Sequence, residues 1–368
     1  MKRHWNRIVI IGVFTSLLII FIVNLIIDPY QIFHQHQKGF LNNERMQNAG
    51  LINSYLDADN GYDAVIIGTS MTENFYASEV SEKMGWGKVL KLSASGASLF
   101  TQKTILLKAL QTGRVKHVLW SLNARMFLEP VDKLQKSDNG FDSLLYLYDN
   151  SRVNDIKYLL NGTTSMASFK MLTGMLNLPT QDLDLLYNNH IISRYVYNKN
   201  QSVKSLKNLE KVYERRMRPP LKTQITKNMK FIALEENFLN IVKEHPAVEF
   251  IVFSPPYSKV SLSHRYEQKN AFLYQVVEHI QVLPNIKIFA FDDCEFNGNV
   301  YFYKDKVHYT ETINSFMINE ISKGNGQVSK DNIDRYYSNT IEGFENYKVY
   351  SEKAVPSCVN RAERIRLD

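Results

Sequence analysis

The sequence predicts an α/β fold whose parallel sheet is covered by helices on both faces. Short, continuous apolar runs alternate along the chain with segments whose apolar residues recur at helical spacing. Strands that are apolar throughout are buried on both faces, which is the situation of parallel strands in α/β proteins. One long apolar segment near the N-terminus and a stretch without this alternation in the middle complete the pattern.

Each strand or helix is predicted from its own pattern. The continuous apolar runs are predicted as strands at 64–67, 89–92, 117–122, 248–253 and 286–291. The amphipathic segments are predicted as helices at 70–83, 99–110, around 231–241, 267–281 and 310–322. In such sheets, sites form beyond the C-terminal ends of the strands, so the residues after each run are the first candidates for function.

Residues 8–27 form a segment of twenty residues without a charge, the length needed for a helix to cross a bilayer core. Lys2, Arg3 and Arg7 precede it, and the positive-inside bias keeps them in the cytoplasm. A cleaved signal peptide and a buried core helix are the competing interpretations. A signal peptide has a shorter apolar region that ends in small residues. We therefore expect a retained single-pass anchor in the cell membrane, with the main domain outside the cytoplasm.

The predicted domain organisation follows from these patterns. We expect a cytoplasmic head, an anchor, a polar stalk, a folded domain and a C-terminal tail at 1–7, 8–27, 28–60, 61–323 and 324–368. The alternation lapses at about 124–246, which is predicted as a mostly helical insertion, a candidate lid or substrate-binding subdomain. Its basic stretch, 204–230, is either a solvated helical face or a site for an acidic envelope polymer, anionic lipid headgroups or a partner protein.

Charge and cysteine content exclude some functions. The net charge is +7, and three of these charges stand before the anchor, so the remainder is too small to indicate nucleic-acid binding. Cys294 and Cys358 are far apart and could pair outside the cell, but their spacing alone establishes no disulfide framework. No metal or cofactor is predicted.

Residues with catalytic chemistry follow the predicted strands. Ser70 comes after the first run, Gly96 after the second and Asn123 after the third, while Asp305 and His308 stand just before the last helix. A serine hydroxyl becomes a good nucleophile when a neutral histidine takes its proton, and an aspartate can fix the orientation of that histidine. Residues 70–73 (Ser-Met-Thr-Glu) also fit a helix capping box, so we expect Ser70 both to begin a helix and to attack substrate.

These blocks resemble those of the SGNH hydrolase family, also called GDSL hydrolases, over about residues 60–322 with the insertion set aside. The resemblance implies a three-layer α/β/α sandwich and a catalytic triad of Ser70, Asp305 and His308. It also implies an oxyanion hole formed by Ser70, Gly96 and Asn123. The first block reads GTS rather than GDS, and the third lacks the usual glycine two residues before Asn123.

The sequence looks closest to membrane-anchored, extracytoplasmic members of that family that are linked to the acylation of cell-envelope polysaccharides. The resemblance implies a serine acyl-esterase or O-acyltransferase, acting on an envelope or exported polysaccharide through an acyl-serine intermediate with O-acetyl as the expected group. A transferase would receive the acyl group through a multi-pass membrane partner. The alternatives are a lipase or thioesterase acting on lipid near the membrane, and a catalytically inactive SGNH-like scaffold or glycopolymer-binding protein.

Overall fold

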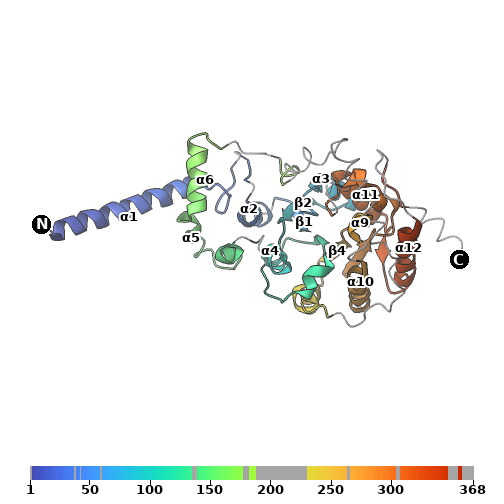
Figure 1. Cartoon of the computed structure of the whole chain (residues 1–368). Coiled ribbons are helices and arrows are strands. Elements are labelled where there is room, and N and C mark those ends of the chain that lie inside the picture. Colours follow the sequence, from blue (N-terminus) through green and yellow to red (C-terminus); the bar gives the residue numbers. More distant parts are fainter. Residues whose placement is uncertain are drawn as a thin grey trace.

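A central sheet in the order β2-β1-β3-β4-β5-β6 organises the chain in the computed structural model (Figure 1). Its strands are β1 Tyr62–Gly68, β2 Lys88–Ser93, β3 His117–Ser121, β4 Glu249–Ser254, β5 Ile286–Ala290 and β6 Gln327–Val328. Strands β1 to β5 pair in parallel, and β6 pairs antiparallel with β5. The predicted α/β class with a mostly parallel sheet is confirmed, and all five predicted strands are present.

The structure describes most of the chain, and the structural statements here concern these residues. They are 2–36, 39–41, 43–58, 60–134, 138, 140–176, 182–187, 230–262, 266–303, 307–346 and 355–358. Nearly all of the basic stretch 204–230 lies outside them, so its predicted role stays a prediction.

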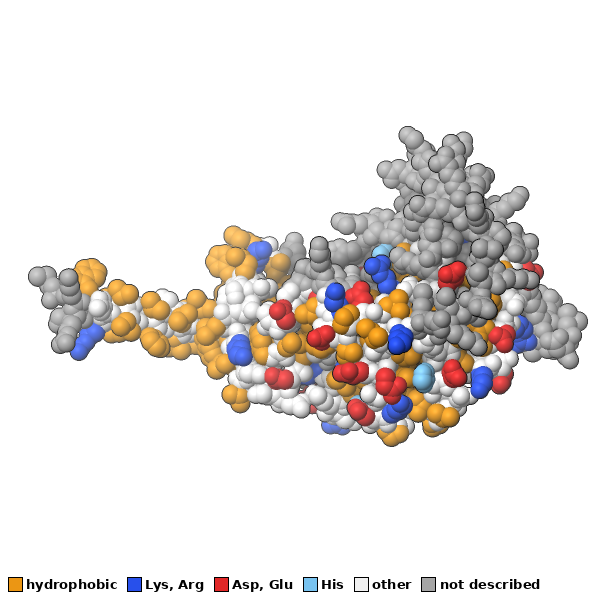
Figure 2. Space-filling view, turned by 60° about the horizontal axis from the view of Figure 1, so that its bottom comes forward, with side chains coloured by type: hydrophobic (Ala, Val, Ile, Leu, Met, Phe, Trp, Pro, Cys, Tyr) orange, Lys and Arg blue, Asp and Glu red, His pale blue; other side chains and the backbone are white. Residues whose placement is uncertain are grey.

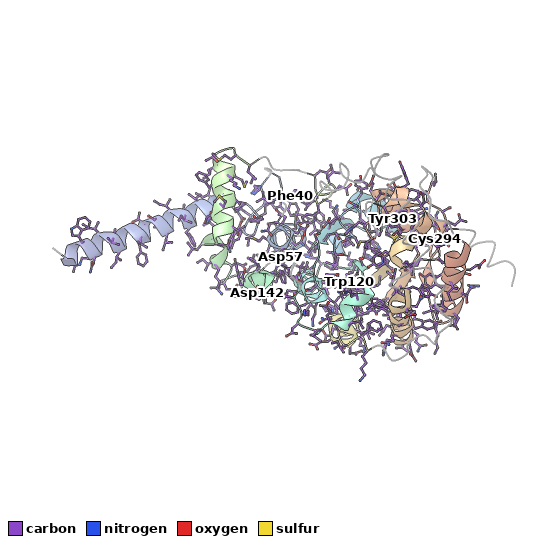
Figure 3. All side chains as sticks on the ribbon, viewed as in Figure 1. Phe40, Asp57, Trp120, Asp142, Cys294 and Tyr303 are labelled. Atoms are coloured by element: carbon purple, nitrogen blue, oxygen red, sulfur yellow. A yellow bond between two sulfur atoms is a disulfide. The ribbon has the colours of Figure 1, made fainter. Side chains whose placement is uncertain are left out.

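Both faces of the sheet are buried, which explains why its strands are apolar throughout. Alternate residues such as Val65 and Ile67 join one core with α2 Glu44–Leu51, α4 Leu99–Gln111 and α10 Tyr266–Ile280. Their neighbours, such as Ile66, join a second core with α3 Ala77–Met84 and α11 Glu311–Ser322. Trp120 of β3 lies deep in the first core (Figure 3), where its indole N–H donates to Gln102 at 3.1 Å.

The structure has further helices besides these. They are η1 Ile52–Leu56, η2 Ala124–Leu128, η4 Phe141–Leu147, α5 Ile156–Leu159, α6 Gly162–Leu172, η6 Glu235–Leu239, α8 Asn240–Glu244, α9 Lys259–Leu262, η7 Glu295–Gly298, η8 Val300–Phe302 and α12 Ile333–Asn346. About half of the described residues of the predicted insertion lie in helices, and the others form turns and loops. The helix predicted at 70–83 is wrong in its first half, because residues 70–74 form turns and α3 begins only at Ala77.

The N-terminal helix α1, Lys2–Ile27, is long and apolar enough to cross a membrane. It projects away from the sheet (Figure 1). Its apolar side chains are exposed along most of its length. Its last turn is different, because Asn24 and Ile27 are buried against the rest of the chain.

The segment 28–60 was predicted as a polar stalk, but many of its described residues pack into the first core. Tyr30, Ile32 and most of α2 are buried. The polar residues of this segment bond to backbone: the Gln47 side chain donates to the Tyr30 carbonyl at 3.3 Å. A Cβ on Gly50 would lie 1.7 Å from that carbonyl oxygen, so only glycine fits there. The prediction was wrong because it treated polar composition as solvent exposure, whereas buried polar groups need only a hydrogen-bond partner.

Residues 324–346, predicted as part of a tail, also belong to the folded body, and Cys358 is joined to it. Strand β6 extends the sheet, and Ile333 and Tyr336 of α12 are buried in the first core. Cys358 is joined by a disulfide to Cys294, which precedes η7. The disulfide ties the end of the described chain to the segment that follows β5.

Candidate active site

Ser70 and His308, which are 238 residues apart in sequence, are in hydrogen-bonding contact. The Ser70 Oγ lies 2.8 Å from the His308 Nε2. Ser70 follows β1, and His308 lies in the segment that leads into α11. Both residues are partly exposed, so a molecule in solution can reach them. A hydroxyl paired with an imidazole in this way is the arrangement needed to activate a serine nucleophile.

The turn that presents Ser70 begins at a glycine because the backbone there is crowded. A Cβ on Gly68 would lie 2.6 Å from Thr72 and 3.0 Å from Ser121. The Thr72 backbone N–H donates to the Thr69 carbonyl at 2.9 Å, and the Thr72 hydroxyl bonds the Ser93 hydroxyl at 2.7 Å. The predicted capping box is therefore wrong. Its glutamate is instead buried beside Glu44 and Ser95, and no helix begins at Ser70.

Two hydrogen bonds join the His308 segment to the Ser70 turn. The Tyr309 hydroxyl donates to the Met71 carbonyl at 3.1 Å, and the Asn74 side chain donates to the Tyr309 carbonyl at 3.5 Å. Tyr309 is buried, and it also pairs with Tyr303 in an isolated bridge. Sequence reasoning missed this support, and its only signal was the position of Tyr309 directly after His308.

Asp305, predicted to orient His308, lies outside the described residues, so that role stays a prediction. The roles of Ser70 and His308 in catalysis are also predictions, although their contact is a property of the structure. Among the described residues, no group of three or more His, Cys, Asp or Glu side chains could hold a metal ion.

The segments that hold Gly96 and Asn123 leave the sheet beside Ser70. Gly68 pairs with Ser93 in the sheet, and the Ala94 N–H donates to the Gly68 carbonyl at 3.0 Å. Gly96 has φ 61°, a conformation that favours glycine. The Asn123 side-chain oxygen accepts from the Arg125 N–H at 3.1 Å, which leaves the amide nitrogen as the group that can donate. An oxyanion role for Gly96 and Asn123 remains a prediction.

The strand order places these segments at the usual ligand position of the fold. In a sheet ordered 2-1-3-4-5, the order in which the strands are added reverses between β1 and β3, and ligands bind at the carboxyl ends of the strands in that crevice. Ser70 follows β1 and Asn123 follows β3, so the two residues flank this switch point.

Helix α2 fixes the turn after β2, a function that sequence reasoning did not find. The Glu44 carboxylate accepts from the Ser95 N–H at 2.5 Å, and the Arg45 guanidinium donates to the Ser95 carbonyl at 3.0 Å. Asn48 donates to the Ser93 carbonyl at 3.0 Å. Both backbone groups of Ser95, the residue before Gly96, are therefore held by side chains from the same helix.

A second carboxyl group, that of Glu73, lies buried beside Glu44. Burial, the negative charge of Glu44 and a hydrogen bond with Glu44 raise the pKa of Glu73 to about 8. The neighbouring Lys91 is also buried, and burial lowers its pKa to about 7 although it donates to the carbonyls of Glu73, Phe75 and Asp184. Two hydrogen-bonded carboxyl groups require a shared proton, so Glu73 is protonated at neutral pH.

This proton predicts a dependence of stability on pH. The pKa of Glu73 is about 8 in the folded chain against 4.5 ordinarily, so its stabilising contribution is complete below about pH 4.5 and declines as the pH rises to about 8. We expect the free energy of unfolding to fall between pH 5 and 7 by at most about 1.4 kcal/mol per pH unit. A Glu73→Gln variant is expected to reduce this slope, most clearly between pH 6 and 7, above the raised pKa of Asp155 of about 6, as measured by chemical unfolding.

The window from pH 5 to 7 avoids the opposite contribution of Lys91 at higher pH. Glu278→Gln, a change at an exposed glutamate of α10, is the matched control and should keep the wild-type slope. Parallel curves for wild type and Glu73→Gln over this window would contradict the shared proton.

Neither the protein-family models nor the curated proteins that were compared with this chain give a match.

Proposed function

We propose that the chain is a membrane-anchored serine acyl-esterase or O-acyltransferase of the SGNH type, with Ser70 as nucleophile and His308 as its base. The observation that carries the proposal is the 2.8 Å contact between the Ser70 Oγ and the His308 Nε2 at the switch point of the sheet. His308 takes the hydroxyl proton as Ser70 attacks an ester carbonyl, and it returns the proton to the leaving alcohol. Water or a sugar hydroxyl then accepts the acyl group.

The oxyanion formed in this attack needs donors that are already in position. The Ser70 and Gly96 backbone N–H groups and the Asn123 amide are the proposed donors, each of which contributes on the order of 3 kcal/mol in comparable enzymes. The bonds from Glu44 and Arg45 to Ser95 favour this proposal, because they hold the turn that presents Gly96 in one conformation.

Two features support an extracytoplasmic location for the catalytic domain. Lys2, Arg3 and Arg7 precede the apolar part of α1, which favours a cytoplasmic N-terminus. The disulfide between Cys294 and Cys358 is the form expected in an oxidising compartment. In that compartment the proposed substrate is an envelope or exported polysaccharide, with O-acetyl as the transferred or removed group.

Covalent labelling tests the proposal. A fluorophosphonate probe is expected to form an adduct on Ser70 of the full-length protein in detergent, identified by peptide mass spectrometry. Ser70→Ala should abolish the adduct. Ser322→Ala, a change at an exposed serine at the end of α11, should leave the adduct unchanged. No adduct on wild-type Ser70 would favour the inactive scaffold instead.

Substrate assays separate the enzymatic alternatives. Unlabelled wild-type enzyme should release acetate from O-acetylated polysaccharide or transfer acetyl to the polysaccharide, with Ser70→Ala inactive in both assays. Cleavage of acyl lipids without any action on acetylated sugars would support a lipase and contradict the polysaccharide substrate.

A further inference from the structure

Helix α6 has the reverse of the amphipathic pattern expected on a water-facing surface. The side that packs on the protein carries the small or polar residues Thr164, Ala167 and Ser168, which are buried. The outward side carries Met166, Phe169 and Leu172, whose exposed fractions are 55%, 55% and 59%. A surface helix in water buries its large apolar residues and exposes its polar ones. The outward side of α6 therefore fits an apolar environment.

Neighbouring residues continue this apolar side. The α5–α6 apolar surface consists of large exposed hydrophobic residues, namely Val153, Ile156, Leu160, Met166, Phe169, Leu172 and Met175. Figure 2 shows hydrophobic side chains along the projecting anchor and again on the part of the body where the anchor joins it. Such a contiguous surface on an exported protein marks a contact with lipid or with another protein.

The end of the anchor is bonded directly to this element. The Asn24 side chain donates to the Leu159 carbonyl at 2.7 Å and to the Ser165 hydroxyl at 2.9 Å. Asn24 is three residues before the end of α1, or about 5 Å along the helix axis. In Figure 1, α6 lies across the end of α1. Helix α6 is thus level with the last turn of the anchor, where a membrane-spanning helix leaves the hydrocarbon core.

Contacts of Tyr158 also fix the orientation of α5 and α6. The Tyr158 hydroxyl accepts from the Tyr30 backbone N–H at 3.1 Å, and the Tyr158 ring packs against Tyr30 and Phe33. Tyr158 is fully buried, so α5 cannot rotate without breaking these contacts. Its apolar surface therefore keeps a constant position relative to the anchor.

Charge on the same segment matches a lipid surface. Residues 153–176 contain Lys157 and Lys170, and the carboxylate in this range, that of Asp155, is buried. Both lysines are exposed. Lysines at the edge of an apolar helix face are typical of interfacial helices, whose ammonium groups meet lipid phosphates while the apolar face reaches about 5–10 Å into the leaflet.

We propose that α5 and α6 form an interfacial element whose apolar surface inserts into the leaflet from which α1 emerges. The proposal rests on the membrane anchoring proposed above for α1. The occupant of the surface is the acyl-chain region of the lipid, with phosphate headgroups at Lys157 and Lys170. A second attachment beside α1 prevents the domain from tilting freely. It also sets the distance of Ser70 from the bilayer. Helix α2 connects the two regions, because it bonds to Tyr30, just after α1, and to Ser95, in the turn beside Ser70.

Fluorescence quenching in lipid nanodiscs tests this arrangement in the full-length protein. The two native cysteines form a disulfide, so a thiol-reactive, polarity-sensitive dye labels only an introduced cysteine. Three single variants are compared: Phe169→Cys on α6, Ile19→Cys on the exposed side of α1 and Val282→Cys between α10 and β5. Each replaces an exposed hydrophobic residue, so none is expected to disturb folding.

The expected result is that the dyes at 169 and 19 are quenched at least about threefold more by brominated lipid than the dye at 282, and that iodide quenches only the dye at 282. If lipid quenches the dye at 19 while iodide quenches the dye at 169 as well as the dye at 282, the interfacial element is overturned and the anchor is not. Accessibility of both 19 and 169 to iodide overturns the anchor as well. A dye at 169 that is accessible in pure-lipid nanodiscs but protected in native membranes overturns the lipid occupant in favour of a protein partner.

Discussion

Replacing His308 with glutamine is expected to lower the rate of acyl-serine formation by about 10⁴-fold, with little change in folding. The side chain of glutamine is similar in reach and can bond to the Ser70 Oγ, but it cannot accept the hydroxyl proton at neutral pH. The loss should fall on the chemical step and leave probe binding unchanged, because His308 acts on the nucleophile. The rate constant for fluorophosphonate labelling of Ser70, measured with full-length protein in nanodiscs, gives the comparison.

The control separates the loss of the base from loss of the fold. His279→Gln alters an exposed histidine at the end of α10 and should retain the wild-type labelling rate. The thermal unfolding midpoint of His308→Gln should match wild type, because the buried support of this segment comes from Tyr309. Labelling of His308→Gln within a few fold of wild type would show that Ser70 does not depend on His308 as its base.

The proximity of Ser70 and His308 could be predicted from a single sequence. Parallel strands buried on both faces are apolar throughout, so the runs that end before Ser70 and Asn123 were recognisable. The carboxyl ends of such strands share one rim, so residues that follow them lie near each other whatever their separation in sequence. His308 was included because it stands before the last amphipathic helix, and that helix begins at Glu311 as expected.

The side chains that hold the loops around the site could not be predicted from a sequence pattern. Glu44 and Arg45 act on the backbone of Ser95, fifty residues later, and a side chain that bonds to distant backbone leaves no periodic pattern. The same effect explains the wrong helix start at Ser70. The residues at 70–73 match a capping box, but the carboxyl group of Glu73 lies against Glu44, so a tertiary partner replaced the local one.

Removing the charge of Lys269 is expected to produce a large loss of stability. Its ammonium lies 2.6 Å from one Asp292 carboxylate oxygen and 2.7 Å from the other. The two side chains are only 5% and 3% exposed. A Lys269→Met variant keeps most of the apolar stem but leaves the Asp292 charge buried without its partner. Breaking such a pair costs about 3–5 kcal/mol in the free energy of unfolding, which chemical denaturation in detergent can measure.

The effect should reach the segment that carries His308. Lys269 also donates to the Pro255 carbonyl at 2.7 Å, just after β4, and lies over the Tyr257 ring at 4.7 Å. The next carbonyl, that of Pro256, accepts from the Tyr303 hydroxyl at 3.4 Å, and Tyr303 pairs with Tyr309 beside His308. Loss of Lys269 therefore weakens the packing behind the His308 segment, and we expect the Ser70 labelling rate of the folded variant to fall by several fold.

A second substitution distinguishes a lost ion pair from damaged packing. Adding Asp292→Asn to Lys269→Met removes the unpaired charge, while the side-chain oxygen can still accept from the Tyr336 hydroxyl, now at 3.2 Å. If the buried charge causes the loss, the double variant should be more stable than Lys269→Met by about 1–3 kcal/mol, because only the neutral cavity and the lost bonds remain. A double variant no more stable than Lys269→Met would instead assign the loss to the contacts of Lys269 with Pro255 and Tyr257. In that case Lys269 stabilises the end of β4 through its contacts, and its charge contributes little to the free energy of unfolding.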